Sequence, residues 1–180
     1  MRRALLILGL AALPALAKEK APPQIAMTAQ HVNPTGAFSF WTPDGWKEGP
    51  VVENPEGVEV SKDQLMVRFL YSPGDSGYDS LHSTCMLIRL ADAMDQAPQV
   101  TYEYDFLSAE IDEMRLLDSA FDVKYDNPVM GASQWRQRNL TIVGRGHSLC
   151  AISYAPTAIW KKSVEARTTL DSIVKSVVFK

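Results

Sequence analysis

Cysteine and histidine are the residue types in this chain that could carry nucleophilic chemistry. The 180 residues include two cysteines, Cys85 and Cys150, and three histidines, His31, His82 and His147. Either cysteine could pair with His82 or His147 as the nucleophile and base of a hydrolase. Cys150, however, stands in the apolar stretch SLCAISYA, where a thiol ionises poorly, and a spacing of three on a strand directs it and His147 to opposite faces. We therefore expect no enzyme activity and keep a small cysteine–histidine hydrolase as the alternative.

Metal and nucleotide sites lack their usual sequence signals. None of the histidines lies in an H-E-x-x-H or C-x-x-C context. The tripeptide Gly144-Arg145-Gly146 is too short to cradle a phosphate, and no helix pattern follows it. No cofactor is therefore expected. In an exported protein, Cys85 and Cys150 could form a disulfide, and two buried free thiols are the alternative.

Charged residues gather in two places that could bind a partner. Acidic side chains are frequent in residues 103–118 and could bind a hard cation, so a metal-binding accessory protein is a further alternative. They could equally be the solvated face of a helix. Three arginines near the expected hairpin could form a small positive patch for an acidic partner, or a solvated sheet edge. Two of them, Arg136 and Arg138, share a face because side chains alternate along a strand. The acidic set is Glu103, Asp105, Glu110, Asp112, Glu113 and Asp118, and the third arginine is Arg145.

Two tryptophans flank a turn in the stretch AFSFWTPDGWKEG. Thr42-Pro43-Asp44-Gly45 has the composition of a turn, with Trp41 before it and Trp46 after it. Such a pair could grip a ligand. Aromatic residues dominate core burial, however, so we expect Trp41 and Trp46 to fold onto one core as a structural aromatic corner.

The first 17 residues, MRRALLILGLAALPALA, have the layout of a cleaved signal peptide. Two arginines precede an apolar run that is too short to span a bilayer, and Ala15-Leu16-Ala17 matches an A-x-A cleavage site. Cleavage removes Arg2 and Arg3 from the 18 basic residues and leaves 16 against 21 acidic residues, a formal charge of −5. That charge is a poor match for nucleic acid. We expect a periplasmic or secreted protein with no stable membrane span after cleavage. The alternative is that residues 1–17 are retained as a short membrane anchor or as a core helix.

Strand and helix patterns divide the rest of the chain. Residues 18–36 are a polar leader with three prolines and a short strand over 25–28, and residues 37–180 are a single domain. The apolar positions Tyr104, Leu107, Ile111, Met114 and Leu117 recur at three and four, which predicts a helix over 101–120 with Thr101 as its N-cap. We expect strands over 64–72, 84–92 and 121–126, a hairpin through residues 144–146, a helix from Pro156 to Val174, and a final strand over 176–180. The strand over 64–72 is apolar on both faces and should be covered on both sides.

The beginning and the end of this pattern resemble a known family. An aromatic strand running into TPDGWK, and a closing segment with SYAP, an amphipathic helix and LDSIVKSVVF, are similar to the PsbP/Mog1-like family across residues 37–179. The resemblance implies an α+β fold, an α/β/α sandwich with a central antiparallel sheet flanked by helices. It also implies a structural role for the two tryptophans of the turn. Members of that family are mostly accessory and binding proteins. Together with the signal-peptide pattern, the resemblance favours an exported, non-enzymatic binding or accessory protein whose partner, a protein or a small molecule, is unknown.

Overall fold

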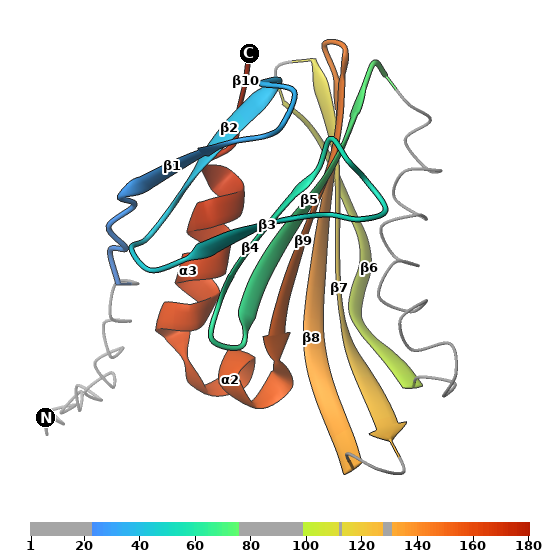
Figure 1. Ribbon diagram of the computed structural model, residues 1–180. Helices are drawn as coiled ribbons and strands as arrows, with labels where there is room; N and C mark the ends of the chain where they lie inside the picture. The colour runs from blue at the N-terminus through green and yellow to red at the C-terminus, as the bar shows by residue number, and fades with distance from the viewer. Residues whose placement is uncertain (1–22, 76–98, 112, 128–130) are drawn as a thin grey trace, which may run out of the picture.

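The structure is a computed structural model that describes residues 23–75, 99–111, 113–127 and 131–180. In these residues, two antiparallel sheets and two helices form the fold (Figure 1). The small sheet has the order β1 (Ala29–Val32), β2 (Phe38–Thr42), β10 (Val178–Phe179). The large sheet has the order β3 (Lys47–Pro50), β4 (Val58–Lys62), β5 (Leu65–Pro73), β9 (His147–Pro156), β8 (Gly131–Gly144), β7 (Met114–Asn127), β6 (Gln99–Ile111). The helices are α2 (Thr157–Lys162) and α3 (Val164–Lys175). The expected α+β fold with an antiparallel sheet is confirmed.

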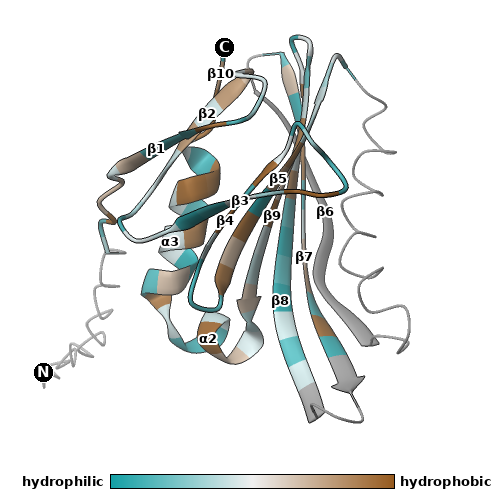
Figure 2. Cartoon of the chain, in the orientation of Figure 1, coloured by the Kyte–Doolittle hydropathy of each residue, from teal (hydrophilic) through white to brown (hydrophobic). Residues whose placement is uncertain are grey.

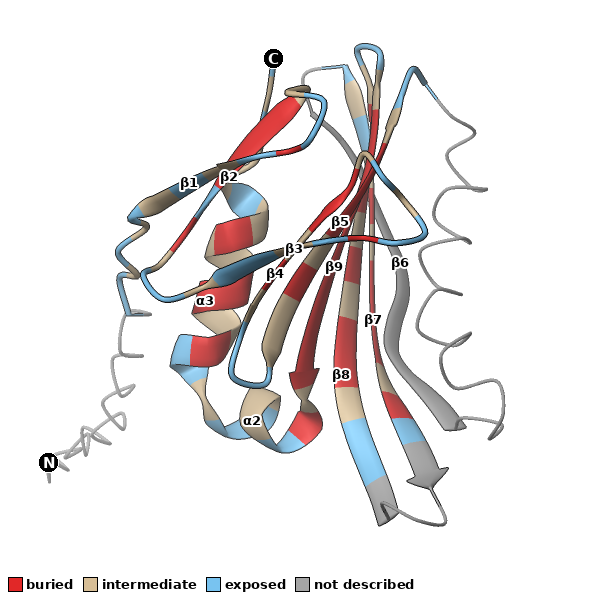
Figure 3. Ribbon diagram, viewed as in Figure 1, coloured by how far each residue is buried: buried red, intermediate tan, exposed pale blue. Residues whose placement is uncertain are grey.

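The main core lies between the large sheet, the small sheet and α3. Phe38 and Phe40 of β2 are fully buried and meet Phe69 of β5, with ring centroids 5.7 and 4.4 Å apart respectively. Leu170 and Ile173 of α3 close the same cluster. Figure 3 shows buried residues on β2, on the central strands of the large sheet and on the side of α3 that faces them. The small sheet and α3 therefore cover one face of the large sheet.

The opposite face of the central strands carries a second, smaller cluster. It contains Leu70 of β5 and the alternate residues Cys150, Ile152 and Tyr154 of β9. Strands β5 and β9 pair antiparallel, with Leu70 opposite Cys150. Both strands are therefore buried on both faces, as expected for residues 64–72, and this explains why their sequences are nearly continuously apolar.

The expected helix over residues 101–120 is wrong, because residues 101–111 belong to β6 and residues 114–120 belong to β7. Thr101 is not an N-cap; it pairs with Asp122 of β7. The register of β6 shifts between Tyr102 and Tyr104 and again between Tyr104 and Leu107. Such irregularities interrupt the alternation of apolar residues at every second position of a strand. The apolar residues Ile111 and Met114, on either side of the turn between β6 and β7, are also three positions apart. The resulting spacings of three and four imitate a helix face.

The C-terminal third of the chain forms largely as expected. The β8–β9 hairpin turns at residues 144–146, where Arg145 has φ +55° and Gly146 has φ +79°. The helix expected from Pro156 is divided at Ser163, whose side chain accepts a hydrogen bond from the N–H of Ala166 and caps α3. Strand β10 lies in the expected final segment. The expected strand over 84–92 lies outside the described residues. The strand expected over 25–28 in the polar leader is wrong, because these residues form no strand and β1 occurs at Ala29–Val32 instead.

Candidate functional site

A half-open groove lies where the turn between β4 and β5 approaches the junction of α2 and α3, and Figure 1 shows these two places side by side. Its volume is about 350 Å³. Its lining is mixed: Ile25, Pro43, Trp46, Leu65, Ile159 and Ala166 are apolar, and Lys62, Asp63, Gln64, Ser163, Glu165 and Thr169 are polar or charged. Concave sites with an apolar lining and a few polar groups are where proteins usually hold ligands. We call this site the Trp46 groove.

The two tryptophans of the turn have different roles. Trp46 packs against the main core and also lines the groove. Trp41 is 38% exposed, so the expectation that both fold onto one core is wrong for Trp41. Strand β2 turns Phe38 and Phe40 inwards and therefore turns Trp41 outwards. Trp41 shares the outer face of the small sheet with Val32 and Val178, which are 42% and 60% exposed.

Charge in the Trp46 groove is divided between two carboxylates and one ammonium. Asp63 stands at the tip of the β4–β5 turn with φ +54° and is exposed. Glu165 lies in the first turn of α3 and is also exposed. Neither carboxylate forms an ion pair within the described part of the chain. The Nζ of Lys62 donates a hydrogen bond of 2.9 Å to the carbonyl oxygen of Asp44 and so lies against the neighbouring turn.

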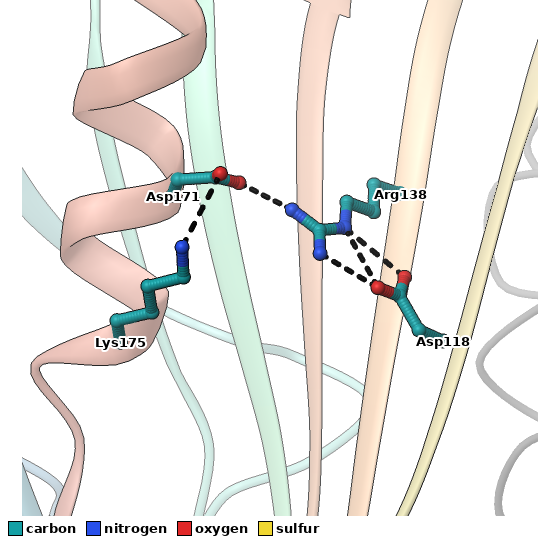
Figure 4. Close-up of polar contacts among 4 residues, drawn as sticks. All are labelled: Asp118, Arg138, Asp171 and Lys175. Carbon is teal, nitrogen blue, oxygen red and sulfur yellow. Dashed lines mark hydrogen bonds and ion pairs between the residues drawn. The ribbon is translucent and has the colours of Figure 1, made fainter. Parts of the chain in front are cut away.

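Arg138 links the large sheet to α3. Its Nε and Nη2 donate to the Asp118 carboxylate of β7, at 3.0 and 2.6 Å, and its Nη1 donates to Asp171 of α3. Lys175 lies 3.7 Å from the other oxygen of Asp171 (Figure 4). Asp118 of β7 pairs with Leu140 of β8, and Arg138 of β8 pairs with Ala120 of β7. Asp118 and Arg138 therefore lie on the same face of the sheet, the face that α3 covers. Arg138 therefore holds the helix against the sheet with both edges of its guanidinium group.

Arg136 and Arg145 complete the set of arginines singled out from the sequence, and the three do not converge on one patch. Arg136 is only 6% exposed, lies 3.4 Å from Asp122, and stacks 5.7 Å from the Trp160 ring. Burial, with Arg138 nearby, lowers the pKa of the Arg136 guanidinium. Arg145 is exposed at the hairpin turn, nine residues away along the chain. Arg136 and Arg138 do share a face, as expected, but they lie on an inner strand and not on a sheet edge.

The cysteine and histidine side chains that the structure describes do not form a catalytic pair. Cys150 is fully buried in the second cluster. His147 lies on the other face, 2.9 Å from the Tyr71 hydroxyl through Nδ1 and stacked on Phe179 at 4.6 Å. His31 is similarly held by Glu48 and Thr42, at 2.6 and 2.9 Å. Cys150 is not a free thiol, while Cys85 and His82 lie outside the described residues.

Solved structures with the same arrangement come from distant organisms. Cyanobacterial PsbP (CyanoP) from Synechocystis superposes with a TM-score of 0.63 at 12% identity, over 95% of this chain and 99% of its own. The Ran-binding protein Mog1p of Saccharomyces cerevisiae superposes with a TM-score of 0.51 at 10% identity, over 86% of this chain and 96% of its own. The chain has a PsbP/Mog1-like fold. A Bacteroides thetaiotaomicron protein also matches, with a TM-score of 0.53 at 12% identity, over 86% of this chain and 49% of its own. No family model matches the sequence, and no curated protein is similar to it in sequence.

On this PsbP/Mog1-like fold, the groove is built from segments that the sequence does not connect. Of its lining residues, Trp46 is the one that the sequence pattern singles out. The others come from the leader, the β2–β3 turn, the β4–β5 hairpin and the region of the two helices, which tertiary packing brings together. Within the described residues, no three histidine, cysteine or acidic side chains group as metal ligands. No described helix is long and apolar enough to cross a bilayer.

Replacing Tyr71 with phenylalanine tests whether the Tyr71–His147 contact is structural. We expect a loss of about 0.5–1.5 kcal/mol in the free energy of unfolding at neutral pH, because one hydrogen bond is removed. Burial and the charge of Glu56 raise the pKa of Tyr71, so the folded state favours the protonated hydroxyl. The free energy of unfolding of the wild type should therefore fall as pH rises above about 10, where tyrosine in the unfolded chain ionises. The difference in free energy of unfolding between the wild type and Tyr71→Phe should narrow over the same range. Urea denaturation across this pH range measures both effects; a difference that widens above pH 10 would contradict the assignment.

Proposed function

We propose that this chain is an exported, non-enzymatic binding or accessory protein that holds its partner at the Trp46 groove. The observation that carries the proposal is the groove itself, with a volume of about 350 Å³ and a lining that includes a tryptophan and two carboxylates that form no ion pair among the residues the structure describes. The PsbP/Mog1-like fold supports it, since Mog1p, one of the solved proteins with this fold, is a Ran-binding protein. Fold alone does not fix function, so the groove and its lining residues are the main support for a binding role.

Capture from a periplasmic extract tests the binding role. The mature chain should retain a specific protein or small molecule that the Gln64→Trp variant does not retain. Gln64 is an exposed lining residue at the β4–β5 turn, so a tryptophan there fills the groove without disturbing the core. The control is Trp41→Leu, which removes an exposed aromatic ring outside the groove. Equal retention by Gln64→Trp and wild type, or turnover of a substrate by the purified protein, would count against the proposal.

Export is proposed from residues 1–17, whose pattern is that of a cleaved signal peptide. The formal charge of −5 after cleavage fits a partner other than nucleic acid. In cell fractions, we expect the protein in the periplasm or medium, with a mass corresponding to a chain that begins at Lys18. An intact N-terminus in the membrane fraction would contradict this part of the proposal.

We also propose that Cys85 and Cys150 form a disulfide in the mature protein. The support is that Cys150 is fully buried and not free, and that Cys85 is the only other cysteine in the sequence. Protein unfolded without reductant should then expose no thiol to an alkylating reagent, and reduction should expose two. Labelling of Cys85 or Cys150 without reductant would show that the bridge is absent. Unfolding before labelling is needed, because burial alone would protect Cys150.

A further inference from the structure

We propose that the Trp46 groove binds a lysine or arginine side chain on a basic segment of a partner protein. This inference rests on the proposed binding function and names the chemistry of the partner. It is carried by three features of the lining: an aromatic ring, two carboxylates that form no ion pair within the described residues, and one ammonium group that already donates a hydrogen bond.

The aromatic ring supplies an apolar surface with a negative face. Trp46 is half-buried, so part of its indole packs on the core while another part lines the groove. A cation over an indole is attracted by the ring quadrupole, and the methylene stem of lysine or arginine can cover the remaining apolar surface. Leu65 and Ile159 extend that apolar surface on both sides of the groove.

The two carboxylates give the groove its preferred charge. Asp63 and Glu165 come from opposite walls, the β4–β5 turn and the first turn of α3. Some other acidic side chains do have cationic partners: Glu53 and Glu59 pair with Arg68, and Asp171 pairs with Lys175. Within the described residues, Asp63 and Glu165 have no such ion pair. A basic partner would supply the missing positive charge.

The basic residue of the lining does not cancel this preference. Lys62 donates to the Asp44 carbonyl, and its Nζ would lie 3.2 Å from a side-chain carbon added at Gly45. Its ammonium therefore lies over the Thr42–Trp46 turn, with one hydrogen bond already formed. The lining has a formal charge of −1 from two acidic residues and one basic residue, and the mature chain as a whole is also negative. A cationic segment is thus favoured both at the groove and during its approach.

Peptide titration provides the test. The probes are an acetylated, amidated peptide of alternating alanine and lysine, and its counterpart with glutamine in place of lysine. By calorimetry at low salt, the mature protein should bind the lysine peptide at least tenfold more tightly than the glutamine peptide. Asp63→Asn and Glu165→Gln should each weaken binding by up to about fivefold, and added salt should weaken it further. Lys62→Met should strengthen it, an effect that a merely structural role would not produce.

Two control variants separate local recognition from net charge and from folding. Glu113→Gln removes one exposed carboxylate at the β6–β7 turn, and Trp41→Leu removes an aromatic ring outside the groove. Both should bind the lysine peptide within about twofold of wild type. Asparagine is well tolerated at the positive φ of Asp63, so Asp63→Asn should fold normally.

The outcomes distinguish this inference from the proposed function. No binding of the lysine peptide, equal binding of the glutamine peptide, or equal weakening by Glu113→Gln and Asp63→Asn would each overturn the inference. If the groove nevertheless retains a partner from extract, the proposed function stands and its partner is not basic. If the lysine peptide binds as expected but no partner is retained, the recognition chemistry is supported while the proposed function is weakened.

Discussion

Replacing Phe38 with alanine should destabilise the protein by about 3–5 kcal/mol, the usual cost of truncating a fully buried phenylalanine. Phe38 joins the small sheet to the large one: its ring meets Phe40, Phe69 and Tyr71 at centroid distances of 6.2, 5.7 and 5.5 Å. Alanine would leave a cavity at the place where β2 packs on β5. Urea denaturation followed by circular dichroism measures the loss.

The matched control for this substitution lies on the same strand. Trp41→Ala removes a larger side chain from β2, but Trp41 faces outwards and is 38% exposed. Its cost should stay below about 1 kcal/mol, because exposed positions tolerate substitution. Equal losses for Phe38→Ala and Trp41→Ala would mean that the small sheet does not pack on the large one as described.

Replacing Arg138 with methionine should cost about 1–3 kcal/mol. Methionine keeps the apolar stem of the side chain but removes the guanidinium group, from which the Asp118 carboxylate accepts hydrogen bonds. The Asp118 side chain is only 15% exposed, so water replaces these hydrogen bonds poorly. Removing one partner of a fully buried ion pair costs about 3–5 kcal/mol, and the partial exposure of Arg138 and Asp171 reduces that figure. Thermal and urea unfolding should both detect the change. Adding Asp118→Asn to Arg138→Met should recover part of the loss.

Arg145→Met is the control for the arginine network. Arg145 is 55% exposed, and its ion pair with Glu113 is 3.8 Å long. Its removal should change stability by no more than about 0.5 kcal/mol. If Arg138→Met proves equally mild, the contacts in Figure 4 do not hold α3 to the sheet.

Local patterns in the sequence predict much of this fold, and their failures have physical causes. The continuous apolar runs of β5 and β9 and the glycines around Arg145 identify a buried pair and a hairpin. The helix expected over 101–120 fails because two register shifts in β6 change the spacing of apolar residues. Helix and strand periods are distinguished by regular repetition, and irregular strands remove that regularity.

Strand β8 shows a second limit of pattern-based prediction. Figure 2 shows β8 as largely hydrophilic, whereas Figure 3 shows its middle as buried. Arg136 is 6% exposed, and Gln137 and Asn139 are at most 1% exposed and bonded to each other at 2.8 Å. Composition places such residues on a surface. The contacts of Arg136 with Asp122 of β7 and Trp160 of α2, and the pairing of β8 with β7 and β9, come from residues outside β8 itself. The sequence pattern of β8 alone therefore leaves these residues as a solvated patch.

The Trp46 groove was not predictable for a related reason. Trp46 alone attracts notice in the sequence, and its aromatic character fits a core residue equally well. Asp63 and Glu165 are ordinary surface residues in isolation. They become lining residues of one groove only because packing places the β4–β5 turn opposite the start of α3, beside the indole of Trp46.

Hydrogen–deuterium exchange with and without the partner retained from extract tests the central claim most directly. If the groove is the binding site, the partner should slow exchange of the backbone amides at residues 62–65 and 159–169. It should leave β1 and β10 of the small sheet and the turn at residues 144–146 unchanged. Protection confined to the outer face of the small sheet, around Val32, Trp41 and Val178, would place binding on a different surface and contradict the account.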